Sequence, residues 1–289
     1  MLGHKVFQVL RERYPTTLGT LARSRRDATL RTVELLQGDD VLENVDVTDH
    51  RVLQATLRER RPDVVVNCVG IVKQRDAAKM PVPSIAINAL LPHVLLELTS
   101  SWGGRLIHIS TDCVFDGKRG GYTEADRPDA DDLYGRTKAM GEIGTAGEAG
   151  ALTLRTSIIG REVASFQSLL EWFLAQRGRT VHGYTRAVYA GVTTNHLAAL
   201  VAQIVGDHPR LSGLFQVVSA PISKYDLLCQ LRGAFDCRVE IVPDDTLLCD
   251  RSMQGGKLRE AIGYVCPPWS DLVRELACDS TPYDRWRGR

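Results

Sequence analysis

Three short apolar runs constrain this chain more than any other feature. They lie at residues 62–66, 105–109 and 151–157, and segments with helical spacing of apolar residues separate them. Short segments dominated by Val, Leu and Ile are typical of strands that are buried on both faces of a sheet. Because helices separate the strands along the chain, we expect parallel strands with helices on both faces. The sequence therefore predicts an α/β fold with a doubly wound parallel sheet.

Composition narrows the functional classes. The 289 residues carry 36 Lys and Arg against 35 Asp and Glu, so no basic stripe indicates nucleic acid. We find no apolar run of about 18 residues and no signal-peptide core, which predicts a cytoplasmic protein without a membrane span. The seven cysteines contain no C-x-x-C pair and the seven histidines lack metal-site spacing. We therefore expect free thiols and no metal.

The segment 105–142 carries the clearest chemistry. A polar Ser-Thr-Asp group ends the predicted strand, a Gly/Asp/Pro-rich loop follows, and Tyr134 and Lys138 open a helix. Spacing of four residues places both on one helical face. A lysine ammonium beside a phenol lowers the pKa of the phenol, so that a tyrosine can transfer a proton near neutral pH. With Thr111 as a second hydroxyl, this pattern predicts ketone reduction or alcohol oxidation, with hydride from a bound nucleotide.

Tyr-x-x-x-Lys alone is also compatible with an ordinary surface helix, so its context carries the interpretation. The run STDCVFDG, followed by GYTEADRPDADDLYGRTKAMGE, resembles the extended short-chain dehydrogenase/reductases, and among them the dTDP-4-dehydrorhamnose reductase group. The resemblance implies that Thr111, Tyr134 and Lys138 are the catalytic hydroxyl, acid and lysine.

The resemblance also implies a Rossmann-like organisation. An NAD(P)-binding domain would occupy residues 1–158, and a small substrate-binding lobe would occupy 159–289. Within that lobe, residues of about 187–218 are expected to return to the main sheet. The polar tail 279–289 is expected to be loosely attached.

The N-terminus departs from the family pattern. The family carries G-x-x-G-x-x-G between its first strand and first helix, whereas residues 1–7 already have the pattern of a helix. Only Gly3, preceded by Leu2, fits the end of that turn. We therefore expect the natural chain to start upstream, and loss of this central strand would split the sheet. The alternative is a chain that does not bind a cofactor.

Further cofactor contacts are implied along the first half of the chain. Residues 16–22 resemble the second strand and are followed by Arg23, Ser24, Arg25 and Arg26, which favour NADP(H), with NAD(H) left open, because guanidinium groups suit a 2′-phosphate. Residues 44–49 resemble the third strand, although Asp49 is equally suited to cap a helix at 50–60. The implied cofactor-binding residues are Leu2, Gly3, Arg23, Asp46, Val47, Asn67, Cys68, Val69, Tyr134 and Lys138.

The predicted function is NAD(P)H-dependent reduction of a 4-keto nucleotide sugar, with a homodimer left open. The implied substrate-binding residues are Thr111, Asp112, Cys113, Tyr134, Ser157 and Ile158. Family members that form rhamnose carry tryptophan where this chain has Ile158, so the sugar stays open. A nucleotide-sugar epimerase is one alternative, and a dehydratase is disfavoured because Cys113 stands where it needs glutamate. The other alternative is a non-catalytic dinucleotide-binding subunit, like the methionine adenosyltransferase beta subunit.

Overall fold

Four parallel strands form the main sheet of the computed structural model, which describes residues 1–72, 79–164 and 166–287. Their order is β10-β5-β4-β3, and every neighbouring pair runs parallel. All three predicted runs are strands of this sheet, as expected for chain segments buried on both faces. The bounds are Val64–Asn67 for β3, Arg105–Thr111 for β4, Ala151–Thr156 for β5 and Gly213–Gln216 for β10.

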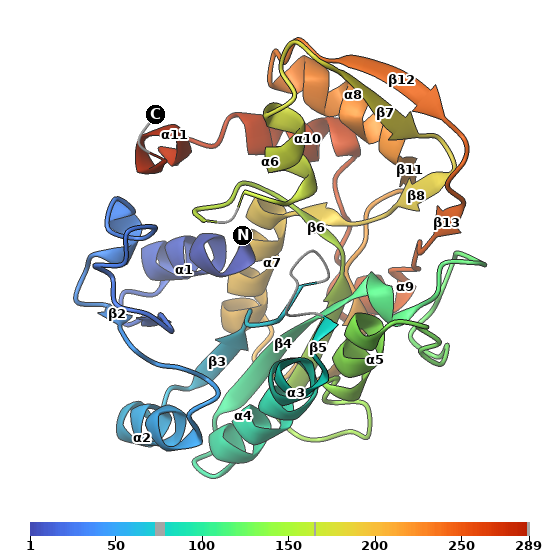
Figure 1. The fold of residues 1–289 in the computed structure, drawn as a ribbon. Coiled ribbons are helices and arrows are strands. Elements are labelled where there is room, and N and C mark those ends of the chain that lie inside the picture. Colours follow the sequence, from blue (N-terminus) through green and yellow to red (C-terminus); the bar gives the residue numbers. More distant parts are fainter. Residues whose placement is uncertain (73–78, 165, 288–289) are drawn as a thin grey trace.

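Helices cover both faces of this sheet, which confirms the doubly wound α/β class (Figure 1). Apolar side chains of α1, α7 and α9 pack with Ile107, Leu152 and Leu154 on one face. Those of α2 and α4 pack with Leu106 and Ala151 on the other. The helix bounds are Leu2–Arg13 for α1, His50–Arg60 for α2, Leu91–Ser100 for α4, Leu133–Met140 for α5, Thr194–Asp207 for α7 and Gly256–Ile262 for α9.

The second predicted strand, 16–22, is shorter than expected. It is β1 (Gly19–Thr20), which pairs in parallel with β2 (Val41–Leu42) and forms a separate sheet in the described part of the chain. The prediction of a strand at 44–49 is wrong. Asn44 has a left-handed backbone and Asp46 accepts hydrogen bonds from Thr48, which turns the chain there. Asp49 instead caps α2, as the alternative prediction has it.

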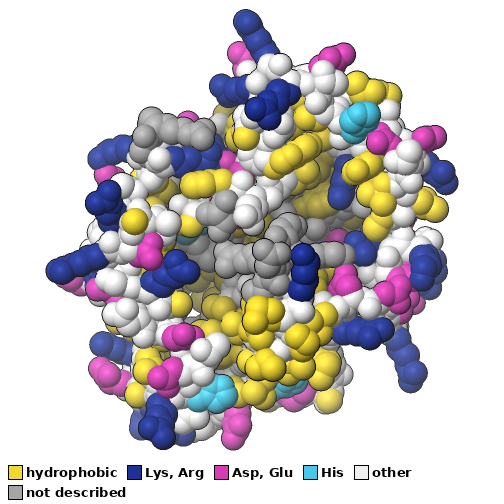
Figure 2. All heavy atoms as spheres, viewed as in Figure 1, with side chains coloured by type: hydrophobic (Ala, Val, Ile, Leu, Met, Phe, Trp, Pro, Cys, Tyr) yellow, Lys and Arg dark blue, Asp and Glu magenta, His cyan; other side chains and the backbone are white. Residues whose placement is uncertain are grey.

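A continuous helical stretch, Pro81–Ser100, departs from the expectation that no segment is long and apolar enough to span a membrane. It comprises α3 (Pro81–Ser84), a π-helical turn (Ile85–Leu90) and α4. Its length and mean hydropathy of 1.4 suffice to cross a membrane by composition alone, because the polar residues within it are mostly uncharged. Its contacts with β3, β4, α2 and α5 nevertheless make it a core helix of this fold. Figure 2 shows the apolar side chains that gather over α3; the exposed ones in this stretch are Val82, Ile85 and Leu90.

The remaining elements build a lobe beside the carboxyl ends of the main strands (Figure 1). Its core joins α6, β7, α8, β12 and α10 around Phe173, Leu227 and Trp269. Its strands are β6 (Ile158–Ile159), β7 (Thr180–Tyr184), β8 (Ala187–Tyr189), β9 (Val192–Thr193), β11 (Ile222–Ser223), β12 (Glu240–Asp244) and β13 (Cys249–Asp250). Its helices are α6 (Leu169–Leu174), α8 (Lys224–Ala234) and α10 (Trp269–Ala277).

The C-terminal segment is anchored over its described residues, 279–287, so the prediction of a loose tail is wrong there. It ends in α11 (Tyr283–Trp286), which packs with Phe7 of α1. Nζ of Lys5 lies 2.7 Å from Oδ2 of Asp279, with both side chains buried. Lys5 and Asp279 are far apart in the sequence, so no local pattern predicts that they pair.

Candidate active site

Thr111 and Tyr134 come together at the carboxyl edge of the main sheet. Thr111 ends β4, and Tyr134 lies in the first turn of α5. The helix begins there because Asp132 caps it, accepting a hydrogen bond of 2.7 Å from the amide of Gly135. The Thr111 side chain lies close enough to Tyr134 to lower the pKa of its phenol, against the larger effect of burial. Two hydroxyl groups therefore converge where parallel sheets bind their ligands.

The Thr111 hydroxyl is itself fixed by its neighbours. It donates to Oδ1 of Asp112 at 3.1 Å and accepts from the amide of Cys113 at 3.1 Å. Burial raises the pKa of Asp112, while Arg251 and the hydrogen bond from Thr111 act in the opposite direction. The geometry thus presents two neighbouring hydroxyl groups beside a half-buried carboxyl group.

The pKa of Tyr134 contradicts the sequence prediction. Burial raises this pKa, and the nearby Cys113 adds to the effect. The prediction that Lys138 lowers it is therefore wrong for this structure. The Tyr134 phenol holds its proton at neutral pH, which suits a group that donates a proton rather than one that begins as phenolate.

Lys138 lies one helical turn beyond Tyr134 and is buried. Its Nζ donates to the carbonyl oxygen of Ile109 at 2.8 Å and lies 3.3 Å from Nε2 of His108. Burial lowers the pKa of Lys138 to about 8, against smaller opposing effects of Glu142 and Cys68. The lysine is therefore close to losing its charge under ordinary conditions.

The predicted cofactor residues at the start of α1 and the end of β3 lie together. A Cβ atom on Gly3 would lie 3.7 Å from Cβ of Cys68, so the first turn of α1 rests on the chain leaving β3. Leu2 points into the core, whereas Val69 is exposed. The Asn67 side chain turns inward to His108 and accepts a hydrogen bond from the amide of Val69. A helix N-terminus facing a turn of small residues fits the phosphate and ribose portion of a dinucleotide.

The other predicted cofactor residues follow the short strands β1 and β2 along the chain. The Asp46 carboxylate accepts hydrogen bonds from the amide and hydroxyl of Thr48, and these bonds lower its pKa. Val47 packs partly into the core on the α2 side of the sheet. Arg23 is exposed and pairs with Asp27 at 3.4 Å, whereas Arg25 is held by Glu43 at 3.0 Å and by three backbone carbonyl groups. Of these two arginines, Arg23 is the one available to a ligand.

On the substrate side, the structure adds a residue that the sequence analysis missed. Ser157 and Ile158 follow β5 directly, next to the site. Tyr189 at the end of β8 is buried, and its pKa is raised first by burial and then by the charges of Asp112 and Cys113. It therefore lines the same site from the lobe. The family resemblance implies that the segment 187–194 belongs to the substrate pocket, but it does not single out Tyr189.

Arg251 is a second missed residue. Its Nε and Nη2 donate to the carbonyl oxygens of Phe115 and Asp116 at 2.8 and 3.3 Å. The same guanidinium acts electrostatically on Asp112 and Cys113. Arg251 thus brings a cation from the far end of the chain to the loop after β4, and only the fold reveals this contact.

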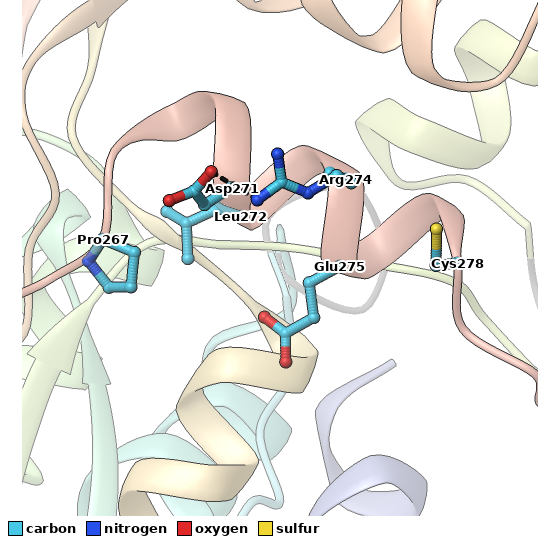
Figure 3. A pocket seen from close by; sticks show the side chains of 6 residues that line it. All are labelled: Pro267, Asp271, Leu272, Arg274, Glu275 and Cys278. Atoms are coloured by element: carbon cyan, nitrogen blue, oxygen red, sulfur yellow. Dashed lines mark hydrogen bonds and ion pairs between the residues drawn. The ribbon is translucent and has the colours of Figure 1, made fainter.

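Elsewhere, a surface pocket of about 400 Å³ lies along α10 and contains none of these residues (Figure 3). Its side chains Asp271 and Arg274 turn toward each other and pair. Within the described ranges, no group of three or more His, Cys, Asp or Glu side chains is placed to hold a metal ion.

Sequence comparison relates the chain to nucleotide-sugar reductases. It matches the family described as RmlD substrate binding domain over residues 3–242. The probable low-salt glycan biosynthesis reductase Agl14 of Haloferax volcanii is 26% identical over 251 residues, 83% of this chain and 80% of that protein. The dTDP-4-dehydrorhamnose reductase of Streptomyces griseus is 34% identical over 34% of this chain and 33% of that protein. Methionine adenosyltransferase 2 subunit beta of Rattus norvegicus is 30% identical over 43% and 38%.

Solved structures with the same fold include a dTDP-4-dehydrorhamnose reductase of Bacillus anthracis in complex with NADP. Its TM-score is 0.72 at 22% identity, covering 82% of this chain and 89% of that one. A UDP-glucose 4-epimerase of Thermus thermophilus in complex with NAD gives 0.73 at 19%, covering 100% and 96%. These likenesses confirm the Rossmann-like fold but do not separate reductases from epimerases.

Proposed function

The chain belongs to the RmlD substrate binding domain family, and on that basis we propose that it reduces a 4-keto nucleotide sugar with a nicotinamide dinucleotide. The observation that carries this proposal is the pair of neighbouring hydroxyl groups of Thr111 and Tyr134 at the end of β4, with Lys138 one turn further along α5. Reductases, dehydratases and epimerases share this fold, so the argument for reduction depends on the side chains of this site.

The residues present fit a dinucleotide. The start of α1 and the turn Asn67–Val69 would hold the pyrophosphate and ribose, and Asp46 and Val47 would lie beside the adenosine. Exposed Arg23 favours NADP(H), because a guanidinium group pairs with a 2′-phosphate. When bound, the dinucleotide would supply the hydride.

In the proposed reaction, the keto oxygen lies between the hydroxyls of Thr111 and Tyr134. As hydride adds to the carbonyl carbon, Tyr134 transfers its phenolic proton to the developing alkoxide, and the product is an alcohol. Thr111 donates to Asp112 in the free protein and would turn its hydroxyl proton to the same oxygen when the substrate is bound. Because burial raises the pKa of Tyr134, the phenol is fully protonated before the reaction, and its phenolate readily regains a proton afterwards.

The lobe around α6, α8 and α10 would hold the sugar nucleotide. Asp112, Cys113, Ser157 and Ile158 would line the sugar subsite, and we add Tyr189, which shares the surroundings of Asp112 and Cys113. Ile158 leaves the identity of the sugar open. A cytoplasmic location and self-association as a homodimer are further parts of the proposal, and sedimentation of the purified chain tests the latter.

The second candidate is a dinucleotide-binding subunit without turnover. The match to methionine adenosyltransferase 2 subunit beta favours it, whereas the Thr111–Tyr134 pair favours the enzyme. One experiment separates them. Dinucleotide binding is measured by fluorescence, and consumption of NADPH is measured with dTDP-4-dehydrorhamnose as the first substrate. Binding with consumption supports the reductase, and binding without consumption across a panel of 4-keto nucleotide sugars supports the subunit.

A further inference from the structure

A buried chain of three polar side chains crosses the sheet beneath the candidate site. Asn67 at the end of β3 lies 3.1 Å from Nδ1 of His108 on β4, measured from Nδ2 of the amide. On the other side of the same imidazole, Nε2 lies 3.3 Å from Nζ of Lys138 on α5. All three side chains are buried, so every donor in this chain needs an acceptor within the protein.

The direction of each hydrogen bond follows from the backbone. Oδ1 of Asn67 accepts from the amide of Val69 at 3.0 Å, which turns the NH₂ group of Asn67 toward His108. Nδ1 of His108 must then accept, and a neutral imidazole that accepts at Nδ1 carries its proton on Nε2. This Nε2–H points at Nζ of Lys138, which accepts only as an uncharged amine. The amine in turn donates to the carbonyl oxygen of Ile109.

A charged Lys138 requires a different arrangement. An ammonium group has no lone pair, so it must donate to Nε2, and the proton of the imidazole must move to Nδ1. That proton then faces the NH₂ group of Asn67 at 3.1 Å, donor against donor. The conflict disappears only if the Asn67 amide turns over, which breaks its bond to the Val69 amide.

We propose that His108 couples the charge of Lys138 to the orientation of the Asn67 side chain, and thereby to the turn that follows β3. His108 is a positioning residue in this scheme, because it acts through Lys138 and Asn67. The inference extends the proposed function, in which Lys138 belongs to the catalytic set and Asn67 to the dinucleotide site. Any ligand that reorients the turn at Asn67–Val69 would then change the charge of Lys138.

The groups around this chain allow such a change of charge near neutral pH. Lys138 faces Glu142 and Cys68 besides His108, and its pKa is lowered to about 8 by burial. Glu142 is already bonded to Arg155 through both carboxylate oxygens at 2.7 Å and to Ser110 at 2.7 Å. Burial raises the pKa of the Cys68 thiol to about 12, so it stays uncharged. Burial, Lys138 and His93 hold the pKa of His108 well below its usual range.

The test is the tautomer of His108 as a function of pH, read from long-range ¹H–¹⁵N correlations of the imidazole rings in the purified protein. A His108→Gln variant assigns the signals. We expect the Nε2–H tautomer above the pKa of Lys138, conversion to Nδ1–H as the pH falls through about 8, and no imidazolium over this range. An unchanged Nδ1–H tautomer throughout, or formation of imidazolium instead, would overturn the proposal.

Two variants sharpen this result. Lys138→Met removes the group that is proposed to titrate, so His108 should keep the Nε2–H tautomer at every pH. Asn67→Leu removes the fixed donor, so the Nδ1–H tautomer should persist to higher pH than in the unmodified protein. A Lys138→Met protein that follows the unmodified titration would contradict the coupling. The tautomer of His108 is measured without substrate turnover. The coupling can therefore be tested even if the protein does not reduce any 4-keto nucleotide sugar.

Discussion

Nζ of Lys138 lies 2.8 Å from the carbonyl oxygen of Ile109. This hydrogen bond ties the helix of Tyr134 to the strand that ends in Thr111. A buried ammonium group that finds one backbone carbonyl and one imidazole is poorly solvated, which is why its pKa falls to about 8. The spacing of Tyr134 and Lys138 in the sequence does not reveal these surroundings. Tyr134 is a protonated acid, and Lys138 is a lysine close to neutrality.

Replacement of the glycine that follows Tyr134 should disturb the site. A Cβ atom at Gly135 would collide with the carbonyl oxygen of Cys113 and with Ala130. Gly135→Ala should therefore push α5 away from the loop that follows Thr111, lower turnover and destabilise the protein by about 1–3 kcal/mol. Gly233→Ala is the matched control, because nothing lies within 4 Å of its added Cβ in α8. It should stabilise by about 0.5–1 kcal/mol in denaturant unfolding. Equal effects of the two substitutions would contradict the packing argument.

The anchor between α1 and the C-terminal segment should contribute strongly to stability. Asp279→Asn leaves Lys5 buried without its charge partner, which should cost about 3–5 kcal/mol in free energy of unfolding. Asp271→Asn breaks an exposed pair with Arg274 and should cost less than about 1 kcal/mol. Urea titrations of both variants make the comparison. A loss at Asp279 no larger than that at Asp271 would show that the tail does not hold α1.

Acid should destabilise the fold through two buried imidazoles. Burial lowers the pKa of His4 to about 3 and that of His108 well below its usual value. The unfolded chain binds a proton at each position below about pH 6.5 while the folded chain does not, so stability is lost as the pH falls below that value. Each histidine should contribute a slope of about 1.4 kcal/mol per pH unit between pH 6 and 4.

Unfolding of His4→Gln measured at several pH values tests this directly, and exposed His50→Gln serves as the control. The first variant should show a shallower pH dependence than the unmodified protein, and the second should not. The comparison uses slopes, because loss of the 2.9 Å hydrogen bond between His4 and Tyr283 also changes the absolute stability.

Exposed Arg23 should set the preference for the dinucleotide. Arg23→Ala should weaken binding of NADPH by about tenfold, the loss of one charge-assisted contact of roughly 1.4 kcal/mol, and leave NADH nearly unchanged. Fluorescence titrations with both dinucleotides measure this. Arg11→Ala, at another partly exposed pair, is the control and should leave both affinities unchanged. If Arg23→Ala weakens binding of NADPH and NADH equally, Arg23 does not contact the 2′-phosphate.

Sequence reasoning captured the parts of the molecule that depend on local patterns. The buried runs at β3, β4 and β5, the Asp49 cap and the helix that presents Tyr134 and Lys138 all follow from spacing and composition. Local spacing cannot show which groups surround a side chain after folding. The direction of the Tyr134 pKa shift was therefore wrong, because burial outweighs the expected effect of a cation.

Contacts between distant segments account for most of what was missed. Arg251 reaches Phe115 across 136 residues, and Tyr189 enters the site from a strand without a distinctive motif. The polar composition of the tail predicts a loose segment. Its side chains Asp279, Tyr283 and Trp286 instead contact α1, through Lys5, His4 and Phe7. Such pairings are set by topology, so only the assembled fold reveals them.

The most direct test of the central claim measures NADPH consumption with a dTDP-linked 4-keto sugar for the unmodified chain and for Tyr134→Phe, beside NADPH binding for both. We predict turnover in the unmodified protein, a fall of about 10²–10⁴-fold in the variant because the proton donor is lost, and nearly equal binding. Turnover that survives the loss of the Tyr134 hydroxyl would contradict the proposed mechanism. Binding without turnover in the unmodified protein, across 4-keto nucleotide sugars, would contradict the proposed function.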